Sequence, residues 1–260
     1  VFYFHGSAGS RLEHPQDQTI LADLCIRLIS CDRPGHGLSD HYPDRAIMNW
    51  PEDVGELADH LEVERFHVMG WSAGGPYALA CAHKLPERVQ TGAVISGIAP
   101  PDRPRPYKGL RIPSRILMFV MRNSPGLVTH FRRAAHRAIS RSSMELRESL
   151  TSSLPPEDKQ LLLIPENLEM LVAGIREGYI QGWHGPARDD IIINRPWGFP
   201  LEDIPRRIDI WHGDLDLNVP LSHSLYQQDR IPDNRLWILP GQAHLGMLAY
   251  WREILEALIE

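Results

Sequence analysis

The segment Gly70-Trp71-Ser72-Ala73-Gly74 decides the fold, because it matches the pattern G-x-S-x-G at the junction of a predicted strand and a predicted helix. Residues 65–69 read RFHVM and predict a short buried strand, and residues 75–84 read GPYALACAHK and predict a helix. The two glycines beside the serine permit a sharp turn and close packing of the helix. Ser72 is therefore predicted to stand at the end of a strand, above a helix N-terminus that favours negative charge.

A serine hydroxyl is a weak nucleophile unless a general base takes its proton and an acid orients that base. Two later stretches, 207–211 and 234–239, predict strands, and they are followed by Asp216 and His244. Because the carboxyl ends of parallel strands meet at one edge of a sheet, both side chains can reach Ser72. The chain order of serine, acid and histidine is the one expected for a serine at a strand-turn-helix junction.

These residues resemble the α/β-hydrolase superfamily, and the resemblance covers nearly the whole chain. Four further segments resemble its motifs in the expected order: the His-Gly oxyanion loop at 5–10, the D-x-x-G-x-G-x-S turn at 32–39, the G-x-x-D acid loop at 213–216 and the histidine loop at 241–244. The resemblance implies that Ser72 attacks a carbonyl carbon, with His244 as the base and Asp216 as its orienting acid. It also implies that the backbone N–H groups of Ser7 and Ala73 form the oxyanion hole, the second of which follows from the G-x-S-x-G turn itself.

Two neighbouring acids, Asp214 and Asp216, follow the same predicted strand. The G-x-x-D spacing from Gly213 selects Asp216. Two carboxylates beside one imidazole would repel each other, and one would tend to take up a proton. We therefore expect Asp214 to point elsewhere and to cap its own loop.

The histidines His5, His36 and His212 are expected to form local hydrogen bonds. For Trp183 and Trp197, packing is preferred to a second interpretation, in which they line the entrance of the site. For Trp71 two interpretations stay open, lining of an acyl pocket or packing in the core. The sequence has no H-x-x-x-H pair and no Cys–His cluster, so we predict no metal site and no cofactor.

Strands and helices alternate in two parts of the chain, which predicts a mostly parallel sheet with helices on both faces. Residues 27–31 and 92–96 predict strands, and residues 50–61 and about 246–258 predict helices. The chain begins inside a predicted strand, so the antiparallel strand pair that usually precedes it in the superfamily is expected to be absent or trimmed.

The stretch between these two parts has a different pattern. Four prolines between positions 100 and 106 indicate a linker, and the residues that follow lack strand signals. We therefore predict an α/β core of residues 1–100 and 206–260, with a helical cap of residues 101–205 inserted in it. Two apolar helical faces are predicted in the cap. The first consists of Leu168, Leu171, Val172, Ile175 and Tyr179. The second consists of Leu127, Phe131, Ala134, Ala135 and Ala138, and Arg133, Arg137 and Arg141 lie on the opposite side of that helix.

Composition limits the classes of function. A chain of 260 residues that is 43% hydrophobic can bury an α/β core, and its net charge of −6 argues against nucleic acid as a partner. Residues 103–147 hold eleven basic residues and one acidic residue, which we interpret as a solvated face in preference to a contact with an anionic membrane. Three cysteines, Cys25, Cys31 and Cys81, lie in apolar runs and are expected to be buried, which favours a reducing compartment. The sequence has no apolar stretch of 18 residues and so predicts no membrane span. Together these observations favour a cytoplasmic location. Oligomeric state stays open.

The residues and the resemblance together predict a serine hydrolase that cleaves a small or medium carboxylic ester through an acyl-serine intermediate. Serine at position 72, where haloalkane dehalogenases and epoxide hydrolases would carry aspartate, disfavours those two chemistries. Thioesters, lactones and carbon–carbon bonds remain possible targets. The alternatives are a ligand-binding or receptor-like protein with a slow triad, a cofactor-free perhydrolase and a hydroxynitrile lyase.

Overall fold

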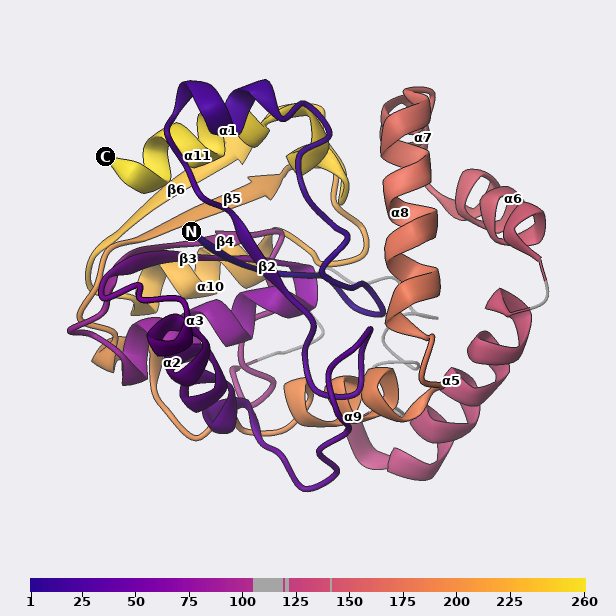
Figure 1. Cartoon of the computed structure of the whole chain (residues 1–260), viewed down its shortest axis with the longest axis horizontal. Coiled ribbons are helices and arrows are strands. Elements are labelled where there is room, and N and C mark those ends of the chain that lie inside the picture. Colours follow the sequence, from indigo (N-terminus) through magenta and orange to yellow (C-terminus); the bar gives the residue numbers. More distant parts are fainter. Residues whose placement is uncertain (105–118, 120–121, 141) are drawn as a thin grey trace.

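The computed structural model describes residues 1–104, 119, 122–140 and 142–260. Within them, parallel strands form a single sheet in the order β2-β1-β3-β4-β5-β6 (Figure 1). The strands are β1 (Phe2–Phe4), β2 (Ile29–Cys31), β3 (Phe66–Trp71), β4 (Val89–Ile95), β5 (Ile208–Gly213) and β6 (Asn234–Leu239). The predicted fold class is confirmed, and β3, which carries the G-x-S-x-G segment at its end, lies inside the sheet between β1 and β4.

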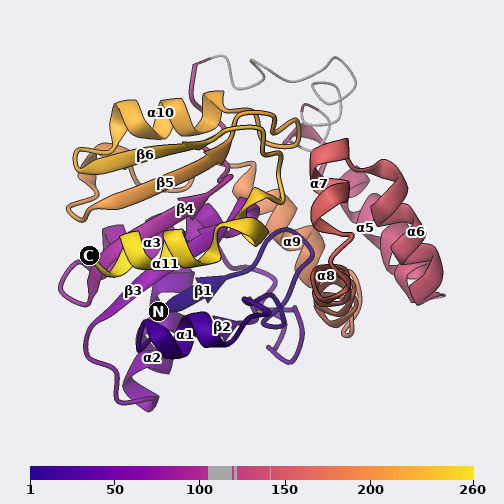
Figure 2. The ribbon, with the colours of Figure 1, turned by 90° about the horizontal axis from the view of Figure 1, so that it is seen from above.

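Helices cover both faces of this sheet (Figures 1 and 2). On one face lie α1 (Thr19–Asp23) and α11 (Trp251–Ile259), and on the other lie α2 (Trp50–His60), α3 (Gly75–Lys84) and α10 (Ser222–Arg230). Successive strand residues point to opposite faces, so Phe2 and Phe4 join the core under α2 and α3 while Tyr3 joins the core under α11. The helix predicted at about 246–258 is divided into a 3-10 turn, Gly246–Ala249, and α11.

Between β4 and β5 the described chain is helical. The helices are α5 (Pro125–Ile139), α6 (Ser143–Ser153), α7 (Pro156–Leu161), α8 (Pro165–Gly178) and α9 (His184–Ile193). In both views they stand together beside the sheet, on the side to which β5 runs (Figures 1 and 2). We call them the inserted helices; the division of the chain into a core and a cap stays a prediction.

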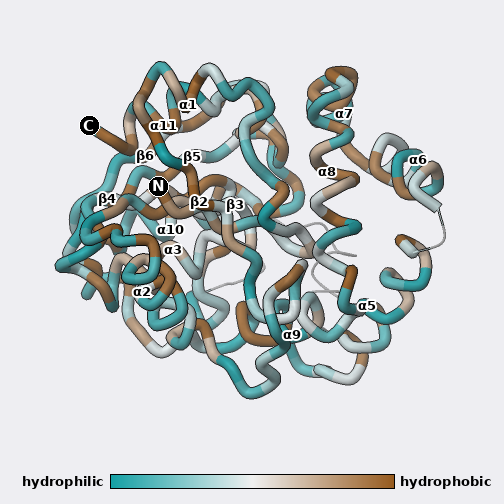
Figure 3. Tube along the Cα trace, viewed as in Figure 1, coloured by the Kyte–Doolittle hydropathy of each residue, from teal (hydrophilic) through white to brown (hydrophobic). Residues whose placement is uncertain are grey.

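The two apolar faces predicted in this segment differ in their surroundings. On α8, Leu171 and Val172 are buried, together with Tyr179 just beyond it. On α5, by contrast, Leu127 is 53% exposed and Phe131 is 66% exposed. Figure 3 shows hydrophobic and hydrophilic residues mixed along α5. The side of α5 that faces the protein carries Val128 and a bonded arginine, Arg132, which leaves the apolar face turned outward; Arg141 lies outside the described residues.

One cysteine prediction is wrong. Cys31 and Cys81 are buried, but Cys25 is exposed. Cys25 follows the short helix α1 in a turn with a φ of 52°, and this turn directs its side chain away from the buried apolar residues.

In the part of the chain that the structure describes, no helix combines the length and the apolar character needed to cross a membrane.

Candidate active site

Ser72 lies immediately after β3 in a strained backbone conformation. Its φ is 53°, in the left-handed region that residues with a side chain seldom occupy. The close approach of neighbouring backbone requires the flanking glycines: a Cβ on Gly70 would lie 2.3 Å from the carbonyl oxygen of Gly74, and one on Gly74 would lie 2.1 Å from that of Phe4. The turn therefore holds the serine at the end of the strand, directly before α3.

The structure brings together the three side chains that the sequence selected. The Ser72 hydroxyl lies 3.0 Å from Nε2 of His244, and Nδ1 of His244 lies 2.7 Å from Oδ2 of Asp216. The other carboxylate oxygen of Asp216 accepts the backbone N–H groups of Asn218 at 2.8 Å and Val219 at 2.9 Å. These bonds fix the carboxylate, which in turn fixes the imidazole with Nε2 toward the serine.

The electrostatics of the pair favour a charged imidazole. Burial alone would raise the pKa of Asp216, but the charge and hydrogen bond of His244 lower it below its ordinary value. Burial alone would lower the pKa of His244, but Asp216 raises it above its ordinary value, with a further contribution from the charge of Asp158. The site is therefore suited to accept a proton at Nε2 and to hold the resulting positive charge.

Asp214 points away from the imidazole, as expected, but the prediction that it caps its own loop is wrong. Its Oδ1 accepts the backbone N–H of Gly241 at 2.8 Å, so it holds the loop that carries His244. His212 is buried and makes local hydrogen bonds: its Nε2 donates to the carbonyl of Val219 at 2.7 Å, and its Nδ1 accepts from Ser224 at 2.7 Å. Burial lowers the pKa of His212 and favours the neutral ring.

Trp71 packs beside the histidine. Its indole N–H donates to the carbonyl of His244 at 3.2 Å, and the two ring centroids lie 5.5 Å apart. Trp71 belongs to the buried cluster under α11. Of its two interpretations, packing is the one that these contacts favour.

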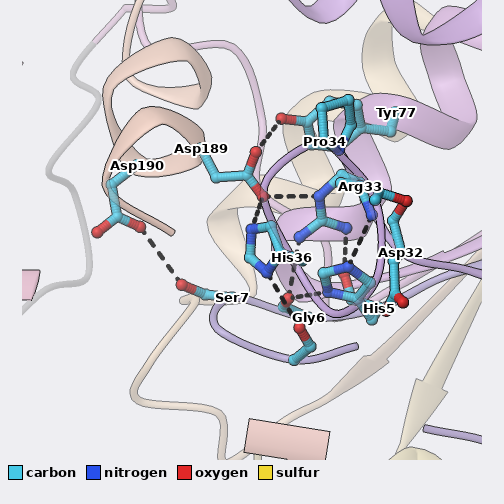
Figure 4. Close-up of polar contacts among 12 residues, drawn as sticks. His5, Gly6, Ser7, Asp32, Arg33, Pro34, His36, Tyr77, Asp189 and Asp190 are labelled. Carbon is cyan, nitrogen blue, oxygen red and sulfur yellow. Dashed lines mark hydrogen bonds and ion pairs between the residues drawn. The ribbon is translucent and has the colours of Figure 1, made fainter. Parts of the chain in front are cut away.

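Both backbone polar groups of Gly6 are hydrogen-bonded, the carbonyl in the peptide to Ser7 and the N–H in the peptide to His5; Figure 4 shows the bonds of the carbonyl. The Gly6 carbonyl accepts from Nη2 of Arg33 at 3.0 Å and from Nδ1 of His5 at 2.9 Å, while the Gly6 N–H donates to Glu13 at 2.9 Å. The C=O and N–H groups of one trans peptide point in opposite directions. The bonds to the Gly6 carbonyl therefore also set the direction of the Ser7 N–H.

Arg33 is fully buried and depends on an acid from the inserted helices (Figure 4). Its Nε donates to Asp189 of α9 at 2.6 Å, and its Nη1 donates to the carbonyl of His5 at 2.6 Å. Asp189 also accepts from the Tyr77 hydroxyl at 2.8 Å and from Arg45. Burial alone would raise the pKa of Asp189, but Arg33 and Arg45 hold it well below its ordinary value, so Asp189 stays ionised between the two guanidinium groups.

The side chain of Ser7 contacts a second group from the inserted helices. Arg132 of α5 donates to the Ser7 hydroxyl at 2.6 Å and to both carboxylate oxygens of Asp190, at 2.5 Å and 2.8 Å. The Ser7 hydroxyl also lies 3.3 Å from Asp190 (Figure 4). The position of Ser7 is therefore set by α5 and α9 as well as by β1.

Glu13 joins this loop to α8. Its carboxyl is buried and accepts from the Tyr3 hydroxyl at 3.3 Å in addition to Gly6. A Cβ on Gly174 of α8 would lie 3.3 Å from the Glu13 side chain. Burial raises the pKa of Glu13 to about 7.

Motif analysis missed Glu13, Arg132, Asp158, Asp189 and Asp190. One signal was available: Asp189-Asp190 stands directly before the apolar run Ile191-Ile192-Ile193, an unusual place for two acids on a buried helix.

Trp197 is buried, and its indole N–H donates to the Ile193 carbonyl at 3.1 Å, which fits the expected packing role. Among the described residues, no three His, Cys, Asp or Glu side chains are grouped in a way that could hold a metal ion.

Comparison with curated proteins finds relatives that match different shares of the chain. An uncharacterized hydrolase of Bacillus subtilis, YcgS, is 34% identical over 80 residues, which are 31% of this chain and 28% of that protein. The pimeloyl-[acyl-carrier protein] methyl ester esterase of Nitrosomonas europaea is 24% identical over 231 residues, covering 86% of this chain and 81% of the relative. The match to the first of these relatives thus spans less than a third of its length.

Comparison with solved structures finds the same architecture over almost the whole chain. A thermophilic esterase from Thermogutta terrifontis superposes with a TM-score of 0.69 at 19% identity, covering 99% of this chain and 87% of that one. At that identity the likeness establishes the fold alone. The model of the α/β hydrolase fold family matches residues 1–249, and the chain therefore belongs to that family.

Proposed function

We propose that this protein is a serine hydrolase that cleaves a small or medium carboxylic ester through an acyl-serine intermediate. The observation that carries the proposal is the continuous hydrogen-bonded series from Ser72 through His244 to Asp216, on a strained turn that presents the serine. A structural serine would not need a histidine whose second nitrogen is bound to a fixed carboxylate.

In the proposed reaction, His244 Nε2 takes the proton of Ser72 as the serine oxygen attacks the ester carbonyl. Asp216 holds the Nδ1–H tautomer and stabilises the imidazolium. The imidazolium then gives its proton to the departing alcohol, which leaves Ser72 acylated. Water attacks the acyl-serine by the reverse sequence, releases the carboxylic acid and restores Ser72.

Negative charge that develops on the carbonyl oxygen needs donors that are fixed in advance. We assign the backbone N–H groups of Ala73 and Ser7 to this role. The Ala73 assignment is supported by its place directly after the serine, and the Ser7 assignment by the bonds of Arg33 and His5 to the Gly6 carbonyl. The Ser7 side chain is engaged with Arg132 and is not needed as a donor.

We further propose that residues 101–205 act as a cap on a core of residues 1–100 and 206–260. Contacts from the inserted helices to both sides of the site support this division: Arg132 donates to Ser7, and Asp158 accepts from the backbone N–H beside His244.

The preference for esters is supported by the methyl ester esterase activity named for the relative from Nitrosomonas europaea.

The test is a series of p-nitrophenyl esters of increasing acyl length, given to the parent and to Ser72→Ala. The variant should lose at least about 10⁴-fold in turnover, and a fluorophosphonate probe should label the parent at Ser72 but not the variant. Ser96 is a matched control, since it is also buried, follows a strand and has a positive φ of 46°; Ser96→Ala should still be labelled.

Two results would contradict the proposal. Equal ester turnover by the parent and Ser72→Ala would exclude Ser72 as the nucleophile. Absence of turnover and of labelling in the parent would instead favour the ligand-binding alternative, in which the three residues are vestigial.

A further inference from the structure

Asp158 is a buried acid of the inserted helices that touches the histidine loop. It lies in α7, its residue has no exposed surface, and its Oδ1 accepts the backbone N–H of Leu245 at 2.8 Å. Leu245 directly follows His244. The hydrogen bond therefore crosses from the inserted segment to the residue next to the proposed general base.

Holding one N–H group does not by itself account for a buried carboxylate. A neutral Asn or Ser could accept the same hydrogen bond without the cost of placing a charge inside the protein. The second oxygen of Asp158 is also buried and meets no donor of ordinary hydrogen-bond geometry among the described residues, although the backbone N–H of His244 lies close enough to lower the pKa of the carboxyl. A positive charge that forms nearby during the reaction would stabilise this carboxylate.

We propose that Asp158 is a positioning residue that holds the backbone beside His244 and adds a second negative charge in favour of the imidazolium formed when Ser72 is deprotonated. This inference rests on the proposed function. Asp216 supplies the first negative charge, through its direct bond to Nδ1. Asp158 acts on the same ring from the inserted helices, without a direct bond to it.

The titratable groups that face the imidazole agree with this role. They are Asp216 and Asp158, which raise the pKa of His244 against the effect of burial, and His212, whose own pKa burial lowers. Burial raises the pKa of Asp158 itself, while the Leu245 N–H and the charge of His244 lower it. The two acids and His244 thus form one electrostatic unit, and of the two acids only Asp216 was apparent from a motif.

Loss of the Asp158 charge should have two opposite effects. The general base must be neutral to act, so the activity falls as the pH drops through the pKa of His244. Without Asp158 that pKa is lower, and the acid limb of the kcat/KM profile moves to lower pH. The plateau of kcat should fall at the same time, because the imidazolium of the transition state is less stabilised.

The experiment compares Asp158→Asn, which keeps an oxygen for the Leu245 N–H, with Glu157→Gln, which makes the same charge change one residue earlier on α7. In Asp158→Asn the acid limb should move down by roughly 0.5 to 1 pH unit, as expected for a neighbouring charge in a partly buried site. Its plateau kcat should fall about 10-fold, with little change in KM. Glu157→Gln should keep the profile of the parent.

A second measurement separates this inference from the proposed function. The His244 ring is titrated by NMR in Ser72→Ala with and without Asp158→Asn, which needs no turnover, and the pKa of His244 should fall when the Asp158 charge is lost. Asp158→Ser, smaller and also able to accept the Leu245 N–H, should give the same direction if Asp158→Asn folds poorly. An unchanged pKa of His244 in these variants, or an equal shift in Glu157→Gln, would overturn the inference.

Discussion

Two regions of the molecule meet at the candidate site, and they contribute differently. The loops at the ends of β3, β5 and β6 supply Ser72, Asp216 and His244, which bond to one another. The inserted helices supply side chains that bond to those loops and to the loop after β1, such as Asp158 on Leu245 N–H and Arg132 on Ser7. The difference indicates that the strand ends would perform the chemistry, while the inserted helices set the geometry in which it occurs.

The sharpest test within the strand-end loops compares two acids two residues apart. Asp216→Asn should lower turnover about 10⁴-fold, because the wrong imidazole tautomer is held toward Ser72. Asp214→Asn should cost far less, since the Asp214 carboxylate bonds the Gly241 N–H and not the imidazole. Steady-state kinetics on one p-nitrophenyl ester measure both, and similar losses in the two variants would show that the acid is wrongly assigned.

At the junction of the two regions, Glu13 predicts a pH dependence of stability. Its pKa of about 7 in the fold lies above its ordinary value of 4.5, so the folded protein keeps a proton that the unfolded chain loses. The free energy of unfolding should therefore fall between pH 4.5 and pH 7, by about 3 kcal/mol more in the parent than in Glu13→Gln. Chemical denaturation of both proteins across this range measures the difference, and parallel curves would contradict it.

Within the inserted helices, the neighbouring arginines Arg132 and Arg133 of α5 allow two substitutions to be compared. Arg132→Met removes the bonds to Ser7 and Asp190 and should lower kcat/KM about 10-fold by loosening the loop after β1. Arg133 is exposed on the same helix, so Arg133→Met should leave kcat/KM unchanged. If both variants behave alike, the inserted helices do not act through Ser7, and the contrast between the two regions is weaker than we infer.

The core could be predicted because its signals are local. The G-x-S-x-G segment, the apolar strands and the acid and histidine loops each lie within about ten residues, and a sheet edge brings their ends together. The start and end of α3 match the predicted helix, and Ser72, His244 and Asp216 meet as expected. In each case the backbone geometry follows from a short stretch of sequence.

The contacts of the inserted helices could not be predicted because they depend on tertiary packing. Glu157 and Asp158 are adjacent acids on one helix, and only the docking of α7 buries the second. The apolar face of α5 illustrates the same limit: periodicity identifies it, but not which side of the helix meets the protein. The prediction that Asp214 caps its own loop was wrong for a similar reason, because its partner Gly241 lies 27 residues away along the chain.

The bond from Arg33 to Asp189 spans 156 residues of sequence. A nascent chain that has left the ribosome only as far as β4 would hold β1, β3 and Ser72 but would lack the acid that neutralises Arg33. The Gly6 carbonyl could then not be held as it is in the complete fold, because an unpaired guanidinium remains hydrated at the surface. The bond between Arg33 and Asp189 therefore cannot form until synthesis has passed α9, so the proposed oxyanion hole would be completed later than the strand turn that carries Ser72.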